Sequence, residues 1–94
     1  MNDTIIRIGP YKLHQTCGAC PEQYDVYLGG EKIAYLRLRH GYFRADVPDC
    51  GGETIYTACP YGNGSFTDRE RQGYLEAALK AIADYYHNKG SDKP

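Results

Sequence analysis

The chain has 94 residues, a length that allows one domain. Its 11 Lys and Arg residues nearly balance 12 Asp and Glu residues, giving a formal net charge of −1. This balance argues against a polybasic membrane anchor and against a long nucleic acid as partner, because nucleic acids require many phosphate contacts. The sequence contains no run of about 18 apolar residues, so it predicts no membrane-spanning helix. Residues 1–4 lack the basic and apolar parts of a secretion signal, so we expect a cytoplasmic protein.

The first two thirds of the chain predict short strands separated by turns. Ile5–Ile8 and Tyr11–Gln15 flank Gly9-Pro10, and the pattern leaves open whether they form two strands or one kinked strand. Four further segments alternate apolar and polar residues: Gln23–Leu28, Lys32–Arg39, Tyr42–Val47 and Glu53–Ala58. We therefore expect an antiparallel meander of four or five strands.

The dipeptide His40-Gly41 fits a two-residue hairpin turn, in which both residues need positive φ. This turn would pair Leu38 with Phe43 and Arg37 with Arg44. All the apolar pairs then lie on one face of the hairpin, so the register is self-consistent.

The preceding turn contains Gly29-Gly30-Glu31. A three-residue loop there pairs Val26 with Ala34 and keeps the same two faces. A two-residue loop would place Val26 opposite Ile33 and break the apolar pattern, so we expect the three-residue loop.

One long helix is expected from Thr67 to about Lys89. Thr67 and Glu70 have the spacing of a capping box, and apolar residues follow at helical spacing. The helix should cover the apolar face of the sheet, giving an α+β fold. We expect a single domain over residues 1–90 and a frayed polar tail over 91–94.

The uncovered face of the sheet is expected to carry tyrosines and arginines: Tyr27, Tyr35, Arg37, Arg39, Tyr42 and Arg44. Arg37 and Arg44 are directly opposed, which is destabilising unless Asp25 and Asp46 or an external anion neutralise them. Three interpretations remain open: a solvated polar face, a surface that contacts another protein, and a platform for a nucleotide. Tyr and Arg are enriched at binding hot spots.

The cysteines suggest a zinc site. The predicted strand directions place the candidate zinc ligands at one end of the sheet. These ligands are Cys17, Cys20 and Cys59, with His40 or His14 as the fourth. Cys50 falls at the opposite end, about 20 Å away for six residues at about 3.3 Å each. Free thiols and a disulfide are the alternatives, and a cytoplasmic setting disfavours the disulfide.

No motif predicts an enzyme. The loop Tyr61–Ser65 precedes the helix and could bind an anion through backbone amides. It lacks the Gly-Lys-Ser/Thr ending of a phosphate loop. We therefore expect a protein that acts by binding.

Self-association is a further expectation. A helix reaching Lys89 would be over about 30 Å long and would overhang the strands. Tyr85 and Tyr86 could then contact a second copy and form a homodimer. The alternative is a frayed last turn with exposed tyrosines.

The whole layout, a compact meander with one helix, no catalytic motif and an aromatic-rich surface, resembles small accessory proteins of phages and mobile elements of the anti-CRISPR or anti-defence type. The resemblance implies an inhibitor that docks on a host or target protein. The alternatives are a binder of a small phosphorylated ligand, such as a nucleotide signal, and a zinc-stabilised interaction module.

Overall fold

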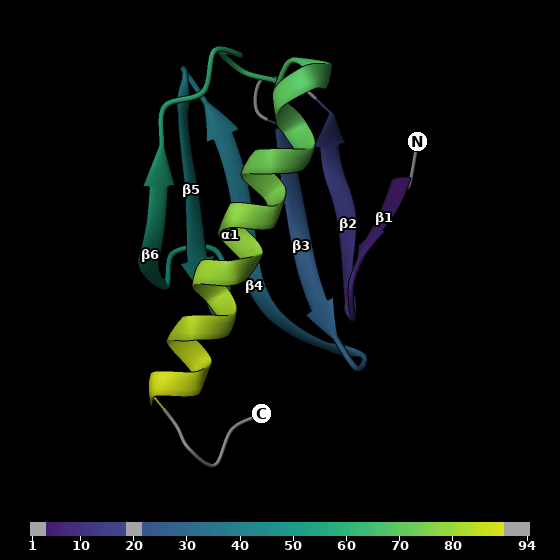
Figure 1. Cartoon of the computed structure of the whole chain (residues 1–94), viewed down its shortest axis with the longest axis vertical. Coiled ribbons are helices and arrows are strands. Elements are labelled where there is room, and N and C mark those ends of the chain that lie inside the picture. The colour runs from purple at the N-terminus through teal and green to yellow at the C-terminus, as the bar shows by residue number, and fades with distance from the viewer. Residues whose placement is uncertain (1–3, 19–21, 90–94) are drawn as a thin grey trace.

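The computed structural model describes residues 4–18 and 22–89 and shows an α+β fold (Figure 1). Six strands form one antiparallel sheet in chain order. The elements are β1 (Thr4–Ile8), β2 (Tyr11–Gly18), β3 (Glu22–Leu28), β4 (Glu31–Arg39), β5 (Tyr42–Val47), β6 (Glu53–Ala58) and α1 (Asp68–Lys89). In the described ranges, no helix is long and apolar enough to cross a membrane.

The sheet has six strands, so the expectation of four or five was too low. The N-terminal segment is two strands, because Gly9-Pro10 forms a tight turn that places Ile8 opposite Tyr11. Gly9 has a φ of 59°, which reverses the chain within two residues. The expected tail over residues 91–94 lies outside the described residues.

The hairpin of β4 and β5 has the expected register. His40 and Gly41 have φ values of 54° and 73°, as a two-residue turn of this type requires. Leu38 pairs with Phe43, and Arg37 pairs directly with Arg44. The prediction of two opposed arginines is therefore confirmed.

The turn between β3 and β4 differs from the expectation. It has two residues, Gly29 and Gly30, with φ values of 62° and 87°. A bulge then leaves Ile33 unpaired, and Val26 still faces Ala34. The prediction of a three-residue loop was therefore wrong. The bulge restores the expected faces, because the extra residue is Ile33 within β4 instead of Glu31 within the turn.

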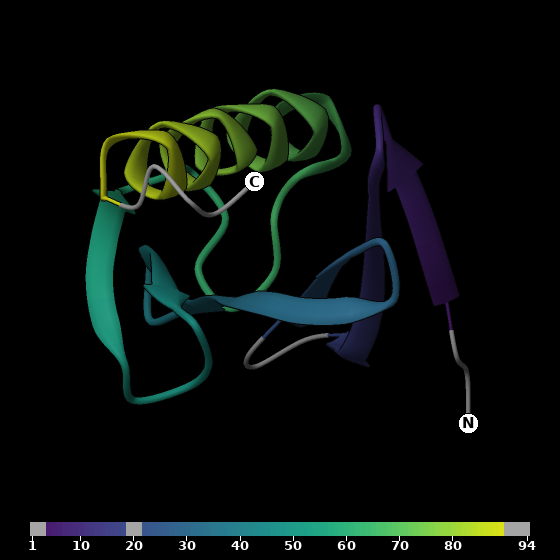
Figure 2. The same ribbon diagram turned by 90° about the horizontal axis from the view of Figure 1, so that it is seen from below.

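Figure 2 shows that the sheet curves around α1, with β1 and β2 on one side and β5 and β6 on the other. The concave face and the helix enclose the core. Its largest fully buried apolar side chains are Leu13, Tyr24, Leu36, Leu38, Phe43, Leu75 and Ile82. The convex face, opposite the helix, is the surface on which the sequence places the arginines.

A buried carboxylate joins the sheet to the start of the helix. Glu22 on β3 is 0% exposed and accepts hydrogen bonds from the amide of Phe66 at 2.8 Å and the hydroxyl of Ser65 at 3.1 Å. It also pairs with Arg71 Nε at 2.8 Å and accepts from the Tyr24 hydroxyl. Burial alone would raise the pKa of Glu22, but the hydrogen bonds from Arg71, Tyr24 and Phe66 outweigh it and lower that pKa.

The expectation that Tyr85 and Tyr86 overhang the sheet was wrong. The Tyr86 hydroxyl donates to the carbonyl of Ile33 at 2.6 Å, and the Tyr85 hydroxyl donates to Glu53 at 3.1 Å. Both rings are half-buried against the core. They pack edge to face, with their ring centres 5.1 Å apart. The end of the helix is hydrogen-bonded to the sheet of its own chain, and a homodimer through these tyrosines stays a prediction.

Candidate functional site

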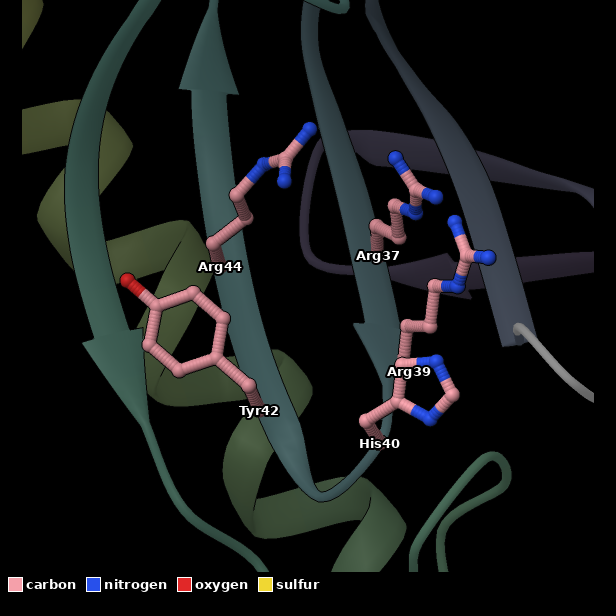
Figure 3. Close-up of a pocket in the computed structure, with 5 residues that line it drawn as sticks. All are labelled: Arg37, Arg39, His40, Tyr42 and Arg44. Carbon is pink, nitrogen blue, oxygen red and sulfur yellow. The ribbon is translucent and has the colours of Figure 1, made fainter.

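A pocket of about 460 Å³ lies on the convex face, at the end of the sheet where β4 turns into β5 (Figure 3). It is lined by Arg37, Arg39, His40, Tyr42 and Arg44. In Figure 3 these side chains stand on the side of the sheet away from α1, with the helix behind the strands. Three guanidinium groups, one imidazole and one phenol thus share a single depression.

The hairpin register builds this pocket. Alternate residues of a strand share a face, so Arg37 and Arg39 project on the same side of β4. Their partners on β5, Arg44 and Tyr42, project on that side as well. His40 lies in the turn, whose Gly41 amide donates to the carbonyl of Asn63 at 2.5 Å. The loop before the helix therefore fixes the end of the pocket.

One arginine of the pocket has a counterion. Arg44 Nε donates to Asp46 Oδ2 at 3.1 Å. Asp46 is 1% exposed and also accepts from the Thr54 hydroxyl at 2.7 Å and the Gly51 amide at 3.2 Å. Asp46 is thus held from three directions, and Arg44 uses only one of its nitrogens on it.

Arg37 has no carboxylate partner in the described part of the chain. Asp25, the expected second counterion, pairs instead with Lys32 at 3.1 Å. Lys32 also pairs with Asp49 at 2.8 Å; this hydrogen bond raises the pKa of Lys32 and lowers that of Asp49. Arg37 Nε is buried and has no hydrogen-bond partner among residues 4–18 and 22–89.

Two tyrosines expected on the binding face are not part of the pocket. Tyr35 is only 7% exposed, and its hydroxyl donates to Gln23 Oε1 at 2.6 Å. Burial raises the pKa of this hydroxyl. Tyr27 lies near the opposite end of the sheet, where Lys12 Nζ is 5.7 Å from the centre of its ring. Of the expected aromatic residues only Tyr42, which is 46% exposed, lines the pocket.

The predicted zinc site stays a prediction. Cys20 lies outside the described residues. Cys17 is half-buried and Cys59 is exposed. Within residues 4–18 and 22–89, no group of three or more His, Cys, Asp or Glu side chains could hold a metal ion. His40, the fourth expected ligand, lines the arginine pocket instead.

The loop before the helix already holds an anion from its own chain. The amides of Tyr61 and Gly62 donate to the Glu70 carboxylate at 2.8 Å each, and the Thr67 amide does so at 2.9 Å. The Thr67 contact confirms that Glu70 reaches back as a capping box predicts. Burial would raise the pKa of Glu70, but the three amides lower it. These amides are therefore not open to an external ligand.

No family model, curated protein or solved structure matches the chain. The candidate function therefore rests on the chemistry of the arginine pocket. The sequence pointed to four of its residues, and His40 was assigned to zinc instead. Its position between Arg39 and Gly41, inside the turn that joins the two arginine-bearing strands, is the signal that places it here.

Proposed function

We propose that this protein is a non-enzymatic binding protein that docks on another protein in the cytoplasm and inhibits or modulates it. The contact is made by the convex face, where the arginine pocket receives an acidic group of the partner. The observation that carries the proposal is the imbalance of charge. Among the described residues, one carboxylate pairs with the three arginines Arg37, Arg39 and Arg44: Asp46, which pairs with Arg44.

The physical argument starts from the opposed arginines. Like charges on directly paired strand positions are destabilising, so the fold pays for holding Arg37 opposite Arg44. Other polar residues at these positions would avoid this cost. An anion that enters between the two guanidinium groups removes the repulsion and forms charge-assisted hydrogen bonds. The strain of the free protein thus becomes part of the binding energy.

The composition of the pocket fits a protein partner. Arginine and tyrosine are the residues most enriched at binding hot spots, and both are present in a concave site. The net charge of −1 argues against long nucleic acids, which need an extended basic surface. The resemblance in layout to small phage and mobile-element inhibitors agrees with action by docking.

Affinity capture from the native host tests the proposal. The wild-type protein should recover a partner that the charge-reversal variant Arg37→Glu/Arg44→Glu does not recover. Arg7→Glu/Arg69→Glu is the matched control, because both residues are exposed, lie outside the pocket and give the same change in net charge. Equal recovery by the wild type and the pocket variant, or equal loss with the control variant, would remove the proposal.

A small phosphorylated ligand is the second candidate, because the arginines line one open depression of about 460 Å³. The arginines would hold the phosphate, and Tyr42 would stack on a ring. Thermal-shift screening with nucleotides separates the two candidates. A nucleotide that binds should stabilise the folded state by about 2.7 kcal/mol when present at about 100 times its Kd. The lack of such a shift with every nucleotide would exclude this candidate.

A further inference from the structure

We infer that the acidic group received by the arginine pocket is a phosphate monoester, carried by a phosphorylated side chain of the partner protein. This inference rests on the proposed function and names the chemistry that the site recognises. It follows from the charge left in the pocket, from the free donors and from the aromatic surface beside them.

The charge of the pocket matches a dianion. Arg37, Arg39 and Arg44 contribute three positive charges, and Asp46 is their one carboxylate partner among the described residues. Two positive charges therefore remain. A carboxylate would neutralise one of them, whereas a phosphate monoester carries about −1.5 to −2 near neutral pH. The phosphate is the better electrostatic complement.

The free donors also suit a group with several acceptor oxygens. Arg44 uses Nε on Asp46, and its guanidinium group makes no other hydrogen bond or ion pair within the described ranges. Arg37 Nε is buried and has no hydrogen-bond partner among the residues that the structure describes. The two residues face each other across β4 and β5, at the Cα separation of about 4.5–5.5 Å typical of paired positions. Two arginines on directly paired positions can direct their donors at different oxygens of one phosphate.

The aromatic surroundings favour a phosphorylated side chain over a nucleotide. A base needs an exposed ring surface for stacking. Tyr42 is the one tyrosine that lines the pocket, beside the smaller imidazole ring of His40, since Tyr35 is buried and Tyr27 lies near the other end of the sheet. The site thus offers three guanidinium groups and little ring surface for stacking.

Calorimetric titration of the full chain with two matched probes tests the inference. Phenyl phosphate and benzoate carry the same ring and differ in the anionic group. At about pH 7.5, where the phosphate is mainly a dianion, and at constant ionic strength, phenyl phosphate should bind at least about tenfold more tightly than benzoate. Equal affinity for the two probes, or no binding of phenyl phosphate, would overturn the inference.

Variants locate the binding. Arg37→Gln and Arg44→Gln should each weaken phenyl phosphate binding by about tenfold or more, because each removes a charged donor. Arg7→Gln and Arg69→Gln make the same change at exposed positions outside the pocket and should leave the affinity unchanged. Comparable losses in all four variants would contradict a site at the hairpin.

A third arm identifies the source of the phosphate. A phosphoserine peptide should bind more tightly than its unphosphorylated form and more tightly than adenosine monophosphate, whereas the reverse order would assign the pocket to nucleotides. Phosphatase treatment of a captured partner should abolish its recovery. Recovery that survives phosphatase but is lost in Arg37→Glu/Arg44→Glu would overturn the phosphate inference and leave the docking function standing.

Discussion

At the scale of single residues, Arg37 and Arg44 are directly paired across the hairpin, and of the two only Arg44 has a carboxylate partner among the described residues. The opposition of Arg37 and Arg44 follows from the turn at His40-Gly41, because a two-residue turn fixes every pair beyond it. The ion pairs of the two arginines do not follow from the turn. Asp25 pairs with Lys32 rather than with an arginine, since side-chain direction depends on strand twist and on a bulge that the sequence does not mark.

The two arginines should differ in their effect on stability. Arg37→Met removes the repulsion without leaving a partner, so it should stabilise the fold by about 0.2–1 kcal/mol at low salt. Arg44→Met leaves Asp46 buried without its ion pair and should destabilise the fold by about 1–3 kcal/mol. Urea unfolding measures both changes. Destabilisation of similar size in both variants would show that Arg37 has a structural partner of its own.

Glu22 predicts how stability depends on pH. Its pKa in the folded protein lies below the ordinary value of 4.5, so its stabilisation is present above that value and is lost as the pH falls through the folded pKa. Glu22→Gln should lower the free energy of unfolding near neutral pH by about 1–3 kcal/mol, because Arg71 loses its charged partner. The variant should also lose less stability on acidification than the wild type.

Urea unfolding from about pH 7 to pH 3 checks this dependence. Glu31→Gln, at an exposed position, serves as the control and should follow the wild-type profile. If Glu22→Gln loses as much stability on acidification as the wild type, the buried carboxylate is not the source of the pH dependence.

At the scale of elements, local signals predicted the strands and the helix, and turn chemistry decided the details. The helix begins next to Thr67, as the capping box indicates. The β3–β4 turn was wrong by one residue, because a two-residue turn followed by a bulge gives the same faces as a three-residue loop. Alternation of apolar residues distinguishes the two faces but does not distinguish these two ways of building them.

Two glycines should respond in opposite ways to substitution by alanine. Gly73 lies within α1, and a Cβ there would meet no atom within 4 Å. Gly73→Ala should therefore stabilise the fold by about 0.8–1 kcal/mol through helix propensity. Gly30 has equal space but a φ of 87°, so Gly30→Ala should destabilise it by about 1–2 kcal/mol. Thermal unfolding of both variants measures the contrast, and a shift of the same sign in both would contradict these backbone assignments.

At the scale of the whole molecule, the closure of the core depends on contacts that are remote in sequence. Glu22 binds the amide of Phe66 across 44 positions and Arg71 across 49. No local pattern marks such a pair, so the buried ion pair was not predicted. The curvature of the sheet around α1 is likewise a property of all six strands together. It leaves the convex face open, with the arginine pocket near the turn that the sequence identified.

The most direct test of the arginine pocket is to map where an anion binds. Amide chemical shifts of the labelled protein, recorded during titration with phenyl phosphate, report the contact residue by residue. We expect saturable changes confined to residues 37–44 and to their neighbours on β3 and β6. Changes centred on the helix or on β1, or no saturable change at all, would show that the pocket is not the binding site.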